Sequence, residues 1–181
     1  MVRRRLVKQE AQKLIAKFPQ CVNDRTIDPV ALATRLGIEV RAANIADNIS
    51  GFLVFDAQGK PFIGVNSSHH THRQRFTVAH EIGHYLLHER TKPHMDDENG
   101  AFNVRLRSDL SSTGSDPREV EANLFAAELL MPSEWLENDI RGHAHIDVFE
   151  NSLISELATR YSVSEHAITI RLTRLGYIDE A

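Results

Sequence analysis

The chain has 181 residues, of which 41% are hydrophobic and 25% are charged, a composition typical of one soluble globular domain. The single cysteine excludes an internal disulfide framework, and no stretch approaches the ~20 apolar residues that a membrane span needs. The net charge of −4 argues against the basic field that sequence-independent nucleic-acid binding requires. We therefore expect a cytoplasmic protein with no role at a membrane.

The first part of the chain is predicted to contain two helices and three strands. Residues 3–18 have helical spacing, and we expect their basic start, Arg3 to Arg5, to be solvated. A second helix is predicted over 28–36, where an aspartate and a proline mark the start and a glycine follows the end. Three β-favouring runs then predict a strand followed by a hairpin: 38–45, 51–55 and 62–66.

The rest of the chain is predicted to be mainly helical. A helix over 71–88 is apolar around most of its circumference, which predicts that it is buried. Residues 91–115 are polar, and we expect a surface loop there, in which only 101–106 resembles a strand. Further helices are predicted at 117–131, 133–140, 147–161 and 163–175.

These elements predict an α+β fold. We expect a small mixed or antiparallel sheet, a central buried helix and a helical C-terminal part. A catalytic core over 1–132 and the helical part over 133–181 are expected to pack together as a single domain.

The central helix contains His80-Glu81-Ile82-Gly83-His84, the HExxH pattern. Positions i and i+4 share one helix face, so both imidazoles can bind one Zn²⁺ while Glu81 reaches a metal-bound water. A charge buried without a partner is costly, and a divalent cation would compensate these groups directly. The alternative is that this edge of the helix faces solvent and that His80 and His84 are ordinary surface residues.

A catalytic zinc site needs a third protein ligand. His88 continues the series but lies about 12 Å along the helix axis from His80, too far for both to share an ion. On the next long helix, Glu119 and Asn123 lie one turn apart on a stripe of small residues. We predict Glu119 as the third ligand and Asn123 as the acceptor of a hydrogen bond from a liganding imidazole. The alternative for Glu119 is a capping box that begins at Asp116.

Other polar residues say less about the chemistry of the site. Glu121 and Glu128 fall on other faces of the same helix, and we expect them to be solvated. The residue that stabilises the oxyanion is left open, and four residues are candidates by type alone: Arg75, Tyr85, His143 and Tyr161.

The two main motifs read Arg75-Phe-Thr-Val-Ala-His-Glu-Ile-Gly-His84 and Glu119-Val-Glu-Ala-Asn-Leu-Phe-Ala-Ala-Glu-Leu-Leu-Met-Pro132. In them the chain resembles the ImmA/IrrE family of zinc metallopeptidases, in a short ImmA-like form. The resemblance implies a gluzincin-like α+β fold, with zinc held by His80, His84 and Glu119. It also implies that Glu81 is catalytic and that the substrate is an Xre-type helix-turn-helix repressor, often encoded in a mobile element, whose cleavage derepresses genes.

Two other functions stay open. One is a zinc-containing protein that sequesters the repressor without cleaving it, although such a binder has no need of Glu81. The other is a DNA-binding helix-turn-helix module at 157–176, with its second helix beginning near Ser164. Residues 151–181 hold three arginines and four acidic residues, a balance of −1, so direct nucleic-acid binding is not expected.

Overall fold

The computed structural model describes residues 1–88, 116–142, 146 and 151–179. The helices are α1 (Arg4–Lys17), η1 (Pro19–Cys21, a short 3-10 helix), α2 (Pro29–Arg35), α3 (Thr71–Leu87), α4 (Pro117–Leu130), α5 (Ser133–Asp139), α6 (Asn151–Tyr161) and α7 (Glu165–Leu175). The strands are β1 (Val22–Asn23), β2 (Thr26–Ile27), β3 (Glu39–Ala43), β4 (Gly51–Phe55) and β5 (Pro61–Asn66). The predicted α+β class is confirmed, whereas the two-residue strands β1 and β2 were not predicted.

The main sheet is mixed and has the order β3-β5-β4. β4 and β5 form the predicted antiparallel hairpin, whose turn is held by Asp56 Oδ1, the acceptor for the amides of Gln58 and Lys60. Gly59 adopts a φ of +77° in this turn, a conformation that favours glycine. β3 runs parallel to β5, a pairing that the sequence pattern did not indicate.

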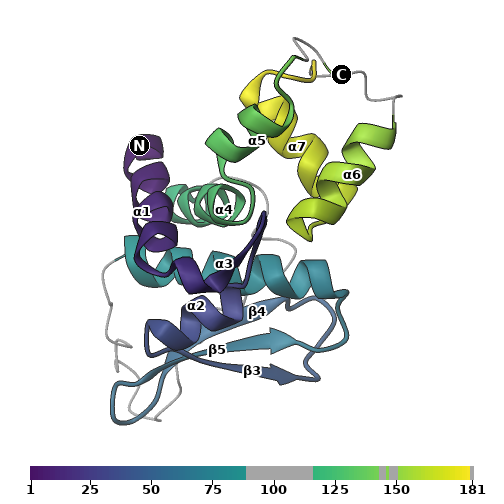
Figure 1. The fold of residues 1–181 in the computed structure, drawn as a ribbon. Coiled ribbons are helices and arrows are strands. Elements are labelled where there is room, and N and C mark those ends of the chain that lie inside the picture. The colour runs from purple at the N-terminus through teal and green to yellow at the C-terminus, as the bar shows by residue number, and fades with distance from the viewer. Residues whose placement is uncertain (89–115, 143–145, 147–150, 180–181) are drawn as a thin grey trace.

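α3 lies between the sheet and α4, so the helix with the HExxH pattern is central to the molecule (Figure 1). Most of its middle is buried, as its apolar circumference predicts. A Cβ at Gly83 would lie 3.1 Å from Phe125 Cδ1 and 3.2 Å from Ala122 Cα. The absence of a side chain at Gly83 and the small side chain of Ala122 therefore let α3 and α4 approach closely at the crossing point.

α5, α6 and α7 group together on the side of α4 remote from the sheet (Figure 1). The Ser164 side chain caps α7 at its start, and Gly176 ends it at a φ of +82°. Arg171 on α7 forms a buried ion pair with Glu128 on α4, and its Nε donates to the carbonyl of Met131 at 3.1 Å. The expectation that Glu128 is solvated is therefore wrong, because α7 supplies a cation that makes its burial tolerable.

Glu121 is the second carboxylate of α4 that was expected to be solvated, and its side chain is only 3% exposed. Arg3 donates to it through Nη2 at 2.6 Å, and this hydrogen bond lowers the pKa of Glu121 to about 2. Arg3 itself is half exposed, so its predicted solvation is only partly right.

None of the described helices combines the length and the apolar character of a membrane span. The predicted surface loop over 91–115, with its strand-like run at 101–106, lies outside the described residues, as does the start of the predicted helix at 147–150.

Candidate metal centre

Three predicted site residues come together where α4 crosses α3. Nε2 of His80 lies 2.9 Å from Nε2 of His84. The carboxylate of Glu119 lies across from both, 3.3 Å from Nε2 of His80 and 3.1 Å from Nε2 of His84. One ligand atom from each residue lies within 4.8 Å of the others. The side chains are 1%, 10% and 19% exposed, so the cluster is largely shielded from water.

Local structure explains this meeting point. The histidines share one face of α3 because they are four residues apart. α4 begins at the N-cap Asp116, which accepts from the amide of Arg118 at 2.8 Å, and Glu119 follows in the first turn. The close approach at Gly83 then brings that turn over the histidines. A glycine inside a helix lowers its stability by about 1 kcal/mol relative to alanine. The presence of Gly83 within a predicted helix is therefore a sequence signal of close packing, and no prediction was based on it.

Asn123 determines the orientation of the His80 ring. Its Oδ1 lies 3.0 Å from Nδ1 of His80, and an amide oxygen can only accept a hydrogen bond. Nδ1 therefore carries a proton, and Nε2 is the ring nitrogen directed toward His84 and Glu119. Nδ1 of His84 is buried and has no hydrogen-bond partner within the described part of the chain.

The donor set fits a divalent transition metal. Hydrogen bonds to His80 and then to His84 hold the pKa of Glu119 far below its usual value, although burial opposes them. The carboxylate is therefore ionised at neutral pH. Two imidazole nitrogens and one carboxylate are the ligand types of catalytic zinc sites, which keep a further position open for water or substrate.

Glu81 follows His80 on α3, so its backbone lies next to that of a candidate metal ligand. It is only 4% exposed. A buried carboxylate next in sequence to a candidate metal ligand is a candidate for proton transfer at the site.

The residues considered as stabilisers of the oxyanion have different surroundings in the structure. Arg75 donates to two backbone carbonyls, one in β2 at 2.8 Å and one in the α6–α7 turn at 3.0 Å. Tyr161 is fully buried and donates to Asp139 at 2.8 Å, and burial is the main reason that its pKa rises. Both residues thus hold elements together. Tyr85 is partly exposed, and His143 lies outside the described residues.

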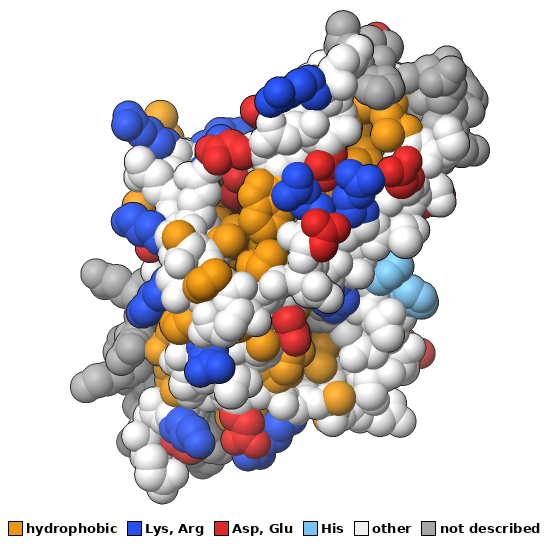
Figure 2. Space-filling view, in the orientation of Figure 1, with side chains coloured by type: hydrophobic (Ala, Val, Ile, Leu, Met, Phe, Trp, Pro, Cys, Tyr) orange, Lys and Arg blue, Asp and Glu red, His pale blue; other side chains and the backbone are white. Residues whose placement is uncertain are grey.

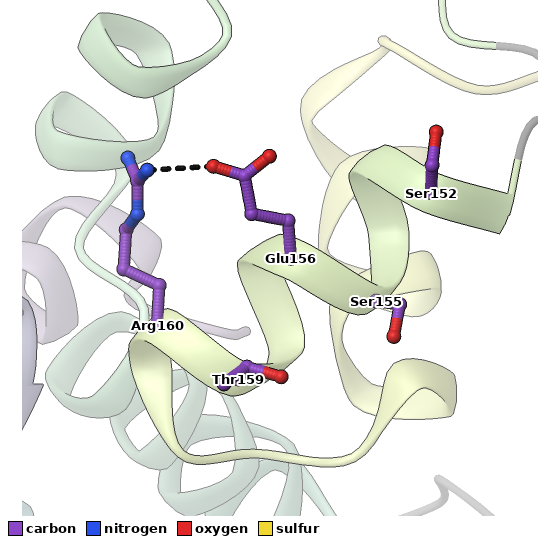
Figure 3. Close-up of a pocket in the computed structure, with 5 residues that line it drawn as sticks. All are labelled: Ser152, Ser155, Glu156, Thr159 and Arg160. Atoms are coloured by element: carbon purple, nitrogen blue, oxygen red, sulfur yellow. Dashed lines mark hydrogen bonds and ion pairs between the residues drawn. The ribbon is translucent and has the colours of Figure 1, made fainter.

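Two of the three arginines in the helix-turn-helix segment 157–176 form ion pairs with carboxylates outside it, and the third, Arg174, is exposed. Arg160 on α6 pairs with Glu156 at 2.7 Å and lies 3.5 Å from Asp139, while Arg171 is buried. A shallow hollow on the outer side of α6 is lined by hydroxyls and by this ion pair: Ser152, Ser155, Glu156, Thr159 and Arg160 (Figure 3). On the face that Figure 2 draws, acidic and basic side chains are interspersed, which is not the pattern of a phosphate-binding surface.

The chain is similar in sequence to a protein family and to individual proteins of Bacillus and its phages. The family model described as the IrrE N-terminal-like domain matches residues 33–173. The chain is 34% identical over 131 residues to uncharacterized immunity region protein 2 of Bacillus phage phi105, covering 72% of this chain and 71% of the phage protein. It is 25% identical over 127 residues to metallopeptidase ImmA of Bacillus subtilis, covering 70% of this chain and 64% of ImmA.

One solved structure, a transcriptional regulator of Mycobacterium tuberculosis, has a similar fold, with a TM-score of 0.61 and 17% sequence identity. The similarity covers 92% of this chain but only 46% of the regulator. The chain thus spans less than half the length of that protein and under two thirds of ImmA, so the similarity is to one part of each.

Proposed function

Because the chain belongs to the IrrE N-terminal-like family of peptidases, we propose that it is a zinc-dependent endopeptidase with His80, His84 and Glu119 as its metal ligands. The observation that carries the proposal is the convergence of two imidazole nitrogens from α3 and one ionised carboxylate from α4 on a common point. The similarity to a protein named as a metallopeptidase supports hydrolysis as the reaction.

In the proposed mechanism, a zinc ion held by His80, His84 and Glu119 would polarise the scissile carbonyl and lower the pKa of the attacking water. Glu81 accepts the proton of that water and then donates it to the departing amine nitrogen. Asn123 keeps Nδ1 of His80 protonated, so that the opposite nitrogen stays available as a ligand. The burial of His80 and Glu81 keeps bulk water away from these steps.

We propose an Xre-type helix-turn-helix repressor as the substrate, cleaved in the cytoplasm to derepress its genes. The name of the phage relative, an immunity region protein, supports a substrate encoded in a mobile element. β4 has a described strand partner on one side, β5, and packs against α3. An extended segment of a protein substrate can pair with the other side of such an edge strand, which suits an endopeptidase.

The test is to incubate the protein with the Xre-type regulator encoded nearest to its gene, with and without a chelator. We expect one defined fragment from the wild type and none after chelation. Glu81→Gln should retain zinc but lose cleavage, because it keeps the shape of the side chain without a group that accepts the proton. Cleavage by Glu81→Gln would contradict the role of Glu81, and cleavage that survives removal of the metal would contradict the whole mechanism.

The cleavage assay and a gel shift separate the two alternatives. A stable complex without a fragment would favour sequestration of the repressor. A salt-dependent gel shift with the isolated protein would favour DNA binding by 157–176, which the pairing of two of that segment's three arginines argues against.

A further inference from the structure

Arg3 joins the two helices that carry the proposed metal ligands. Its Nη2 donates to the carbonyl of Leu87 in the last turn of α3, at 3.1 Å. The same nitrogen and Nε donate to the carboxylate of Glu121 on α4, at 2.6 and 3.0 Å, and the backbone amide of Arg3 donates to it at 2.7 Å. One residue near the start of the chain therefore bridges positions that are 84 and 118 residues away.

This junction lies close to the metal centre along both helices. Leu87 is three residues after His84, and Glu121 is two residues after Glu119. His88 adds a second tie at the same place, because its Nε2 lies 3.1 Å from the carbonyl of Arg118, the residue before Glu119. Two side chains, those of Arg3 and His88, thus connect the end of α3 to the first turn of α4.

The chemistry of the junction favours an arginine. The carbonyl of Leu87 is one of the last four of α3 and has no partner within the helix. Glu121 is 3% exposed, so its charge needs a cation beside it. A guanidinium has several N–H groups in a fixed plane and can serve both acceptors together, whereas a lysine ammonium lacks this fork.

We propose that Arg3 is a positioning residue for the metal centre: by joining Leu87 to Glu121, it holds Glu119 at the distance from the two histidines that one ion requires. The inference rests on the proposed function of that site. Glu119 lies in the first turn of α4, and helix ends fray more readily than helix centres. Ligand distances to zinc vary by only about 0.2 Å, so small displacements of that turn weaken binding.

The experiment measures Zn²⁺ binding to the full chain by competition with a chromophoric chelator, together with the free energy of unfolding of the metal-free protein. Arg3→Ala is compared with Arg25→Ala, a matched control. Arg25 also donates through Nε and Nη2 to a buried carboxylate, that of Asp139, which lies on α5 and not on a ligand-bearing helix. Arg3→Lys tests whether a positive charge alone, without the planar N–H groups of a guanidinium, restores Zn²⁺ binding.

We expect Arg3→Ala to weaken Zn²⁺ binding at least about tenfold, and Arg3→Lys to recover part of the loss. Arg25→Ala should lower the stability of the metal-free protein but leave Zn²⁺ affinity within about twofold of the wild type. The visible absorption bands of Co²⁺ bound in place of zinc should change in Arg3→Ala and stay unchanged in Arg25→Ala. Should Arg3→Ala fail to fold, Arg3→Lys provides the same comparison with the control.

Two failures can be told apart. If the wild type binds zinc and the folded Arg3 variants bind it as tightly with the same Co²⁺ spectrum, the role of Arg3 is refuted and the proposed metal centre stands. If the wild type binds no zinc, the proposed function fails, and this inference fails with it.

Discussion

Nδ1 of His80 lies 3.0 Å from Oδ1 of Asn123, so α4 fixes the orientation of a ring on α3 and also presents Glu119 to it. Asn123 and Glu119 are one turn apart on α4, and they contact opposite nitrogens of the one imidazole. A displacement of α4 would therefore disturb the ligand and the ring it faces together. The placement of α4 against α3 is the structural basis of the proposed site.

Replacement of Asn123 should weaken metal binding only if the new side chain lacks an oxygen that accepts a hydrogen bond from His80. Asn123→Leu removes the oxygen that accepts from Nδ1 of His80, and we expect Zn²⁺ affinity to fall by about 10–100-fold. Asn123→Asp keeps an acceptor oxygen and should stay within a few-fold of the wild type. Chelator competition measures both, and equal affinities for the two variants would rule out this role for Asn123.

A side chain at Gly83 should separate the two ligand-bearing helices. Gly83→Val places a branched Cβ where even one carbon would lie 3.1 Å from Phe125 and 3.2 Å from Ala122, so α4 has to move. We expect a clear loss of both stability and Zn²⁺ affinity. In Gly83→Ala, a gain of about 1 kcal/mol in helix propensity offsets the crowding, so zinc affinity should fall more than stability does. Thermal unfolding and metal titration check the pair, and wild-type zinc affinity in Gly83→Val would count against the packing argument.

The buried ion pair between Arg171 and Glu128 should contribute to stability and not to metal binding. Arg171→Met leaves the Glu128 carboxylate buried without its cation, which costs about 3–5 kcal/mol of unfolding free energy. The double variant Arg171→Met with Glu128→Leu should recover much of that loss, because neither charge then remains. Urea unfolding measures the cycle. A double variant as unstable as the single one would show that packing, not charge, dominates there.

The sequence predicted the helices of the site well. The bounds of α3 and α4 agree with the predicted ranges to within one residue, because apolar spacing defines α3 and a proline bounds each end of α4. The relation between His80 and His84 depends only on helix pitch. That Glu119 would lie opposite them required an assumption about which face of α4 meets α3, and the small residues on that face supplied it.

Other features depend on tertiary contacts that no local pattern reveals. Glu121 and Glu128 read as solvated because a lone charge avoids burial, and only distant partners, Arg3 and Arg171, reverse that preference. The parallel pairing of β3 with β5 likewise depends on how the hairpin folds back beside β3. Each of these contacts joins residues that are more than twenty positions apart, beyond the range of periodicity and capping rules.

The most direct test of the metal centre is the zinc content and coordination of the purified protein, measured by elemental analysis and X-ray absorption. We predict one zinc ion per chain, bound by two imidazoles and at least one oxygen ligand. His80→Ala, His84→Ala and Glu119→Ala should each lose most of the metal, while Glu81→Gln retains it. If the three ligand variants keep one zinc per chain with wild-type affinity, the ion is bound elsewhere and the account of this site is wrong.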